Sequence, residues 1–383
     1  MHPVPTIVFI DDGISPEFVP KGISFENYIV NDDAVQPSDP EHVVSHGTMC
    51  YQIFKNNIII QSYHLISIKV LDSSVGTGNH KALLAALEWC AGQNIDIINM
   101  SMGTRQYTDF VPIAEAISRL SNVTIVAACS NQNELTFPAC LPAVIGVRHC
   151  SHEALRGKHV FLSAPYDQID VMTCANDMPI SFSGGQDPVT DIGGTNSFAT
   201  PIISARICDY MSQGHRGIDV IKLKLREDET SDFGVPGYDF YKKMFSTWQK
   251  LGVPVVGVID DGHTYAKLVT VIAEFVEEGY RAIGLTAEGE TNAAKLVYKL
   301  KWHGAGQVDT PGLINMYYNF TLPDVVFLHM PLSDLIALPE DVQADVLLKP
   351  VGGSSLEYDH WGEEYILDLD MEDLLVNIEK LLS

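Results

Sequence analysis

Val8-Phe9-Ile10-Asp11-Asp12-Gly13-Ile14, near the start of the chain, is an apolar run that ends in acidic residues and a glycine. The apolar residues predict a fully buried strand, so the Asp11 carboxylate is expected at the carboxyl end of that strand. Gly13 permits a sharp exit of the backbone. Two later segments add a histidine and a serine, so that an aspartate, a histidine and a serine occur in that chain order. These segments are Ser45-His46-Gly47-Thr48 and Asn196-Ser197-Phe198-Ala199-Thr200-Pro201.

These three residue types suit nucleophilic catalysis. A serine hydroxyl is a weak nucleophile until a neighbouring base takes its proton, and a histidine has a pKa near neutrality. A buried carboxylate on the other ring nitrogen fixes the tautomer of that base. Pro201 is expected in the first turn of a helix, where its missing N–H costs little. Ser197 is therefore expected at a helix N-terminus, whose dipole favours a developing oxyanion.

The order Asp, His, Ser resembles that of the subtilases, the subtilisin-like family of serine proteases. The resemblance implies that Asp11 orients His46, that His46 is the base and that Ser197 is the nucleophile. Thr124–Asn131 is similar to the segment that gives the side-chain oxyanion donor, which falls on Asn131. Two departures are Ser130 and the pair Thr195-Asn196, where the family usually has Gly and Gly-Thr.

A further segment, Asp96-Ile97-Ile98-Asn99-Met100-Ser101-Met102-Gly103, resembles the family's strand that pairs with an extended substrate. Ser101, Met102 and Gly103 are accordingly the expected substrate-binding residues, with Gly103 leaving space beside the cleaved bond. The resemblance implies a peptide or protein substrate. Taken singly, each segment is also explained by a buried strand, a turn or a helix cap.

Composition restricts the partners and the compartment. The chain has 383 residues, 46% of them hydrophobic, and a formal net charge of -25. This charge argues against nucleic acid and against an anionic membrane surface as partners. The first residues lack a basic leader and a long apolar run, so we expect a cytoplasmic protein without signal peptide or propeptide, active as synthesised. Seven cysteines at irregular spacing predict free thiols, and no spacing predicts zinc, calcium or another cofactor.

Strand-like and helix-like runs alternate over the first part of the chain, which predicts an α/β fold with a doubly wound parallel sheet. The subtilase resemblance covers about residues 4 to 213, so residues 1–220 are predicted to form a subtilisin-like peptidase domain. A charged stretch, 221–240, is predicted as a linker, although Ile218–Leu225 could be an extra strand. The expected elements are Thr6–Ile10, Gln61–Leu71, His80–Ala91, Ile95–Met100, Thr108–Leu120, Val123–Ala128, Val144–Arg148 and a helix from Ser197 to about Gln213.

A second, smaller Rossmann-like α/β domain is predicted over residues 241–383. It resembles either a degenerate phosphate-loop domain, with Asp261, Ala266 and Leu268 in place of the phosphate and magnesium groups, or a receiver-like domain. Asp260-Asp261 and Lys349 match the receiver pattern, but His329 stands where the phosphoacceptor would be. We therefore expect a binding or regulatory module. Its expected elements are strands at Val253–Ile259, Ala282–Thr286, Asp324–His329 and Ala344–Lys349 and helices at Tyr265–Glu278, Asn292–Leu300 and Met371–Leu382.

The sequence leaves three functions open. The first is an intracellular serine endopeptidase that removes the leader from a ribosomally made natural-product precursor peptide. The second is a general intracellular protease. The third is a non-catalytic peptide-binding scaffold with the same fold, which has no physical need for Asp11, His46 and Ser197 together.

Overall fold

The chain divides into two compact units, Met1–Val235 and Pro236–Ser383. The computed structural model describes residues 4–71, 80–162, 165–183, 188–189, 192–234, 236–245, 251–260, 262–289, 291–300, 309–350, 356–360 and 363–367. Within these residues no helix combines the length and the apolar run that a membrane span needs.

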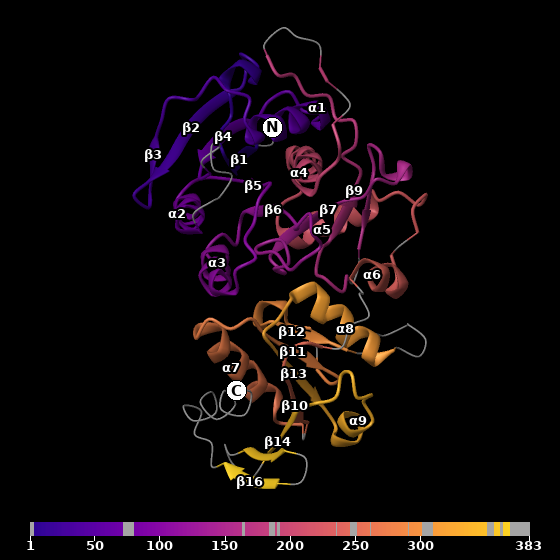
Figure 1. Ribbon diagram of the computed structural model, residues 1–383. Helices are drawn as coiled ribbons and strands as arrows, with labels where there is room; N and C mark the ends of the chain where they lie inside the picture. Colours follow the sequence, from indigo (N-terminus) through magenta and orange to yellow (C-terminus); the bar gives the residue numbers. More distant parts are fainter. Residues whose placement is uncertain are drawn as a thin grey trace. The chain divides into compact units, whose positions relative to one another are not determined.

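The first unit is built on a twisted nine-stranded sheet in the order β3-β2-β4-β1-β5-β6-β7-β9-β8 (Figure 1). Its strands are β1 (Thr6–Asp11), β2 (Ser24–Asn31), β3 (Ala34–Pro37), β4 (His64–Lys69), β5 (Ile97–Met100), β6 (Thr124–Ala128), β7 (Val144–His149), β8 (His159–Phe161) and β9 (Val171–Thr173). The inner strands pair in parallel, whereas β3 and β8 at the two edges run antiparallel. Because β1 lies in the middle, the Asp11 end of that strand is enclosed by its neighbours.

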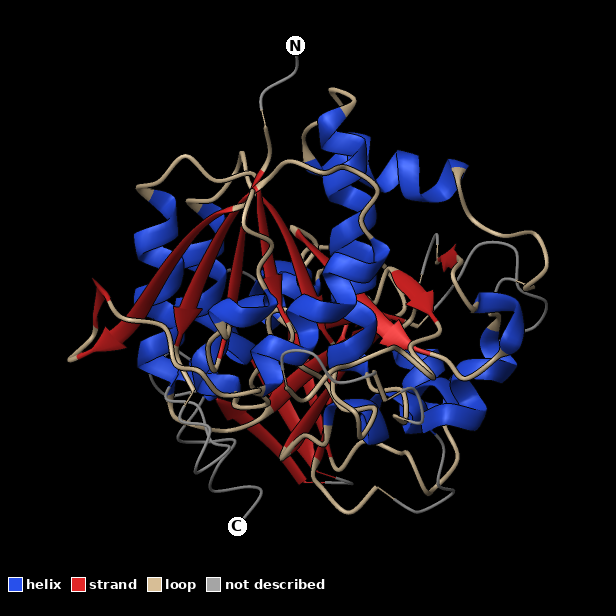
Figure 2. Ribbon diagram, turned by 90° about the horizontal axis from the view of Figure 1, so that it is seen from above, coloured by secondary structure: helices blue, strands red, loops and turns tan. Residues whose placement is uncertain are grey.

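Helices cover both faces of this sheet (Figure 2), as the alternating pattern predicts. They are α1 (His46–Asn57), α2 (His80–Ala91), α3 (Phe110–Ser118), α4 (Asn196–Ser212) and α5 (Ile218–Glu227). Helices α1 and α4 contact each other, and α2 contacts α3. The core beside α1 and α4 holds buried Tyr51, Phe54, Ile202 and Ile203 packed on strand residues such as Phe9. Both helices that carry candidate site residues are thus fixed by apolar burial.

Two segments of the first unit differ from expectation. Residues 218–227 form helix α5, which begins before the expected linker and occupies part of it. The strand considered for Ile218–Leu225 is therefore wrong, because Ile218, Ile221 and Leu225 recur at helical spacing and the last two are fully buried. The sequence analysis also predicts no strand for the hairpin of β2 and β3. Most of its residues are half-buried or exposed, and buried and exposed positions alternate only weakly.

The second unit contains a seven-stranded sheet in the order β12-β11-β13-β10-β14-β15-β16. Its elements are α6 (Tyr238–Phe245), β10 (Val255–Ile259), α7 (Tyr265–Glu277), β11 (Ala282–Thr286), β12 (Val297–Lys299), α8 (Thr310–Thr321), β13 (Val325–Met330), α9 (Leu332–Ile336), β14 (Val346–Pro350), β15 (Leu356–His360) and β16 (Glu363–Leu367). The strands from β12 to β14 are parallel, and β15 and β16 add an antiparallel edge.

The order of these strands differs from that of a receiver domain. In the receiver order the first strand lies between the second and the third. Here the first strand, β10, lies between β13 and β14 instead. The receiver-like interpretation therefore does not extend to the topology. Asp261, Met371–Leu382 and the side chain of Lys349 lie outside the described residues.

The helix expected over Asn292–Leu300 is wrong. A short 3-10 turn at Ala293–Lys295 ends at Leu296, whose φ of 56° lies in the left-handed region, and the chain continues as β12. A helix cannot continue through such a residue. The sequence analysis does not predict helix α8, although two residues indicate where it begins. Asp309 caps its N-terminus by accepting the Gly312 N–H, and Pro311 stands in its first turn.

Candidate active site

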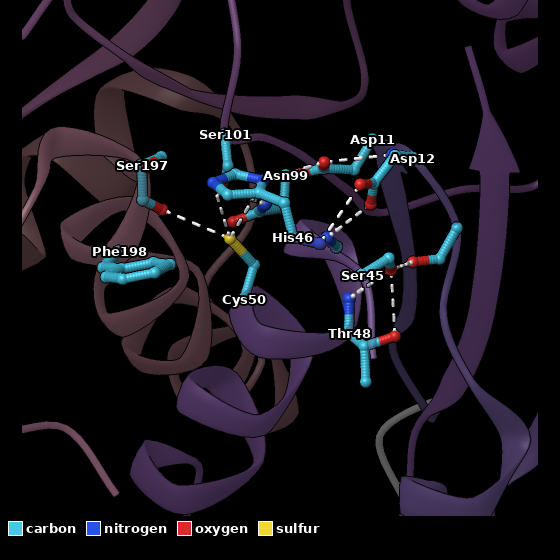
Figure 3. Close-up of polar contacts among 12 residues, drawn as sticks. Asp11, Asp12, Ser45, His46, Thr48, Cys50, Asn99, Ser101, Ser197 and Phe198 are labelled. Carbon is cyan, nitrogen blue, oxygen red and sulfur yellow. Dashed lines mark hydrogen bonds and ion pairs between the residues drawn. The ribbon is translucent and has the colours of Figure 1, made fainter. Parts of the chain in front are cut away.

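Asp11 ends β1 and has 1% of its surface exposed. Its Oδ1 lies 2.9 Å from His46 Nδ1 and also accepts the Asp12 N–H at 3.0 Å. Figure 3 shows the carboxylate facing the imidazole ring. Asp11 is therefore placed to hold the Nδ1–H tautomer of His46, which leaves Nε2 as the basic nitrogen.

His46 is the first residue of α1, and three contacts fix that helix end. Ser45 caps the helix through its Oγ, which accepts the Thr48 N–H at 3.2 Å. Asp12 accepts the N–H groups of His46 at 3.1 Å and Gly47 at 2.7 Å. A side chain on Gly47 would place Cβ 2.6 Å from the Gly13 carbonyl oxygen, so only glycine allows this approach. The loop after β1 and the start of α1 are thus joined around His46.

The surroundings raise the pKa of His46. The charge of an ionised Cys50 would raise it most and the Asp11 carboxylate raises it too, whereas burial lowers it. Burial raises the pKa of the Cys50 thiol itself, so at neutral pH that sulfur is uncharged. Asp11 is then the charge that acts on the ring, and it favours the protonated form of His46 whereas burial opposes that form.

Ser197 is the second residue of α4, at the positive end of the helix dipole. Its hydroxyl lies 2.9 Å from Thr195 Oγ1, and Thr195 caps the helix by accepting the Phe198 N–H. Among the described contacts, Ser197 Oγ has no hydrogen bond to His46. The hydroxyl has to turn from Thr195 toward the imidazole before His46 can take its proton.

Pro201 lies deeper in α4 than expected. The helix begins at Asn196, so Pro201 is inside it rather than in its first turn. Its missing N–H therefore deprives the Ser197 carbonyl of the usual helical donor. The Cys50 thiol donates to that carbonyl instead, with Sγ 3.5 Å from Ser197 O. This contact joins α1 directly to α4.

Asn131 follows β6 and contacts the start of α4. Its Oδ1 accepts the Asn196 N–H at 2.9 Å, so its Nδ2 group is the end of the amide left to donate. Asn196 itself accepts the His149 N–H at 2.7 Å and donates to the Ser130 carbonyl at 2.8 Å. The departure at Asn196 thus forms hydrogen bonds that join the Asn131 loop to the Ser197 helix, and Ser130 takes part through its backbone carbonyl.

A cavity of about 310 Å³ brings the expected site residues together. It is lined by His46, Ser197, Asn131, Ser101, Met102 and Gly103, with further residues of the 128–136 segment. A Cβ on Gly103 would lie 2.6 Å from the Phe137 carbonyl oxygen. The chain's own backbone therefore requires glycine here, in addition to any space for a substrate.

The family model of the subtilase family matches residues 5–215, which is more than half of the chain. The chain belongs to the subtilase family. It is similar to subtilisin DY of Bacillus licheniformis, with 29% identity over 155 residues, 39% of this chain and 54% of that relative. It is also similar to an intracellular serine protease of Paenibacillus polymyxa, with 26% identity over 37% of this chain and 47% of the relative. The chain thus spans about half the length of these relatives.

Among solved structures, the fold is similar to a lanthipeptide protease, with a TM-score of 0.47 and 15% sequence identity over 61% of this chain and 82% of that chain.

In this subtilase the structure adds polar neighbours that the motifs did not indicate. Asp12 accepts the N–H groups of His46 and Gly47, Thr195 contacts the Ser197 hydroxyl, and Cys50 contacts both His46 and Ser197. Cys50 could have been found from the sequence, because it stands four residues after His46 in an expected helix, and such residues share one face. The expected absence of a metal site rested on the spacing of cysteines and histidines and on the lack of a calcium loop in the sequence.

Proposed function

We propose that this chain is a serine endopeptidase in which Asp11, His46 and Ser197 form the catalytic triad. The observation that carries the proposal is the 2.9 Å contact between Asp11 Oδ1 and His46 Nδ1 beside a cavity that His46, Ser197 and Asn131 line together. Membership of the subtilase family over residues 5–215 supports it. A scaffold that only binds peptides would have no need for a buried carboxylate on the histidine.

In this mechanism Ser197 Oγ attacks the scissile carbonyl while His46 Nε2 takes the hydroxyl proton. Asp11 orients the ring and stabilises the imidazolium that forms. The oxyanion receives hydrogen bonds from Asn131 Nδ2 and from the Ser197 N–H at the start of α4. His46 then passes its proton to the leaving amine, and water repeats the sequence on the acyl-enzyme.

The test is a fluorophosphonate probe, which reacts only with an activated serine, together with cleavage of a peptide substrate. We expect labelling of the full chain and its loss in Ser197→Ala, with the circular dichroism spectrum unchanged. Thr200→Ser serves as a control in the same helix and should keep labelling. Cleavage at a wild-type rate by Ser197→Ala would refute the triad.

We further propose that the enzyme acts inside the cell and removes the leader from a ribosomally made precursor peptide. Seven free cysteines support a reducing compartment. The second α/β unit supports recognition of a part of the substrate remote from the cleaved bond. Cell fractionation with a specific antibody tests the compartment. Equal cleavage of a precursor and of unrelated unfolded proteins would favour a general protease instead.

A further inference from the structure

Phe198 follows Ser197 in α4, and its ring lies beside the imidazole of His46 (Figure 3). The two rings are stacked, with 5.7 Å between their centroids and 18° between their planes. Phe198 has 7% of its surface exposed and belongs to the core beside α1 and α4. This ring has no part in the catalytic steps proposed above.

Two features fix the Phe198 ring against the imidazole. Thr195 Oγ1 accepts the Phe198 N–H at 3.3 Å, so the backbone that carries the ring is held by the helix cap. The ring is packed into the core, where side chains are held close to one rotamer. The imidazole is held at its edge as well, because Asp11 Oδ1 lies 2.9 Å from Nδ1. His46 thus has a carboxylate at one edge and an aromatic ring on one face.

The electrostatics of this stack change during the reaction. An aromatic ring attracts a cation that lies near its face within about 6 Å of its centroid, and the attraction is stronger where water is excluded. The distance of 5.7 Å lies within this range. His46 becomes an imidazolium when it takes the Ser197 proton, so a positive charge then appears beside Phe198. The attraction is therefore stronger in the transition state than in the resting enzyme, which is the condition for catalysis.

The titratable groups around His46 come from the end of β1, from α1 and from the wall of the cavity. They are Asp11, Asp12, Cys50 and Arg105. Burial raises the pKa of the Cys50 thiol, which is uncharged at neutral pH, and Arg105 is paired with Glu134. The start of α4, Asn196–Ser204, contains no charged residue. On the side of α4 the imidazole therefore meets an aromatic ring instead of a charge.

We propose that Phe198 is a positioning residue whose ring stabilises the imidazolium form of His46 and fixes one face of the base. Its effect on catalysis rests on the proposed peptidase function, whereas its effect on the protonation of His46 does not. Because Phe198 and Ser197 are neighbours in α4, the same helix end places the nucleophile and supports the base. An aliphatic residue at this position would fill the space but would give the imidazolium no such attraction.

The first measurement follows the protonation of His46 by NMR in the full chain with Ser197→Ala, which cannot digest itself. The His46 signal is assigned by its loss in His46→Gln. Phe198→Leu should lower the pKa of His46 by about 0.4–1.5 pH units, the shift that a cation–π contact of ordinary strength produces. Phe161→Leu is the matched control, because Phe161 is also buried but lies in the edge strand β8, and should leave this pKa unchanged. An unchanged pKa in Phe198→Leu would overturn the proposal.

The second measurement is the pH profile of the protein that retains Ser197. Phe198→Leu should reduce kcat about 2–30-fold with little change in KM and should move the acid limb of kcat/KM to lower pH. A ring that only fills space would lower kcat without moving that limb, and this result would overturn the proposal.

A third measurement decides the matter if Phe198→Leu folds poorly. Fluorinated phenylalanines at position 198 keep the shape of the ring but weaken the negative charge of its face. In the Ser197→Ala chain the pKa of His46 should fall with each added fluorine, and a pKa independent of fluorination would overturn the proposal. A falling pKa in a chain whose Ser197 form cleaves no peptide would retain the stacking role and refute the peptidase.

Discussion

At the scale of single residues, His46 can act as a base only in its neutral form, and Asp11 raises the pKa of the ring. The protonated form is favoured below that pKa, so kcat/KM should fall as the pH decreases through it. The acid limb of the profile of kcat/KM against pH should report the pKa of His46 in the free enzyme. Asp11→Asn should move this limb to lower pH and reduce kcat by about 10⁴-fold. If the acid limb of the residual activity of Asp11→Asn did not move, Asp11 would not be a cause of the raised pKa of His46.

Asn131 allows a second prediction at this scale. Asn131→Asp keeps the oxygen that accepts the Asn196 N–H but removes the Nδ2 donor. We expect kcat to fall by about 10²–10³-fold, the loss known for the side-chain oxyanion donor of subtilisin, with little change in KM. Asn131→Ala should also lose the hydrogen bond from the Asn196 N–H and should therefore lower the melting temperature further. A loss confined to KM would indicate that Asn131 contacts the substrate rather than the oxyanion.

At the scale of elements, the hydrogen bond between α1 and α4 involves the Cys50 thiol and the carbonyl that Pro201 leaves without a helical donor. Cys50→Ala leaves the Ser197 carbonyl without its thiol donor, and an unsatisfied buried polar group costs about 1–3 kcal/mol. Pro201→Ala restores a backbone N–H to the helix. We therefore expect Cys50→Ala to destabilise the Pro201→Ala protein less than the wild type.

A double-mutant cycle in the Ser197→Ala background, followed by denaturant unfolding, measures this coupling. Cys90→Ala is the control, because that buried cysteine lies in α2, away from α4. A cycle in which the two substitutions are additive would show that the thiol and the proline act independently.

The same scale shows what the sequence can predict. Helix α2 and strand β11 have their expected bounds, because their apolar periodicity and the polar residues around them agree. The Asp11, His46 and Asn131 positions follow from strand and helix ends in a parallel sheet, where carboxyl ends converge. By contrast, the Asn292–Leu300 segment has helix-forming residues, and a single left-handed residue, Leu296, ends the turn. The contact between the Cys50 thiol and the Ser197 carbonyl depends on how α1 packs against α4, which no local sequence pattern specifies.

At the scale of the whole molecule, two described positions of the second unit carry other residues where groups for phosphate chemistry would stand. Leu268 is buried in α7, and His329 is held between the hydroxyls of Thr264 and Thr286, at 2.9 and 3.0 Å. A Cβ on Gly257 would lie 2.6 Å from Leu347, so this glycine serves packing. We expect no ATP or GTP turnover and no nucleotide affinity tighter than about millimolar, or about 4 kcal/mol. Micromolar binding by calorimetry would contradict this.

The second unit does offer a cavity of about 220 Å³ at the carboxyl ends of β11 and β13, lined by Ala287, Met330, Ala337 and their neighbours. Ligands of open parallel sheets bind at this edge, so we expect a segment of the natural substrate to bind here. Ala337→Trp would fill the cavity in the full chain, while Ile336→Trp places the same bulk on a residue that is 64% exposed. Ala337→Trp should slow cleavage of the full-length precursor but not of a short peptide spanning the same bond. Ile336→Trp should change neither rate, and an equal loss on both substrates would show that the cavity does not recognise substrate.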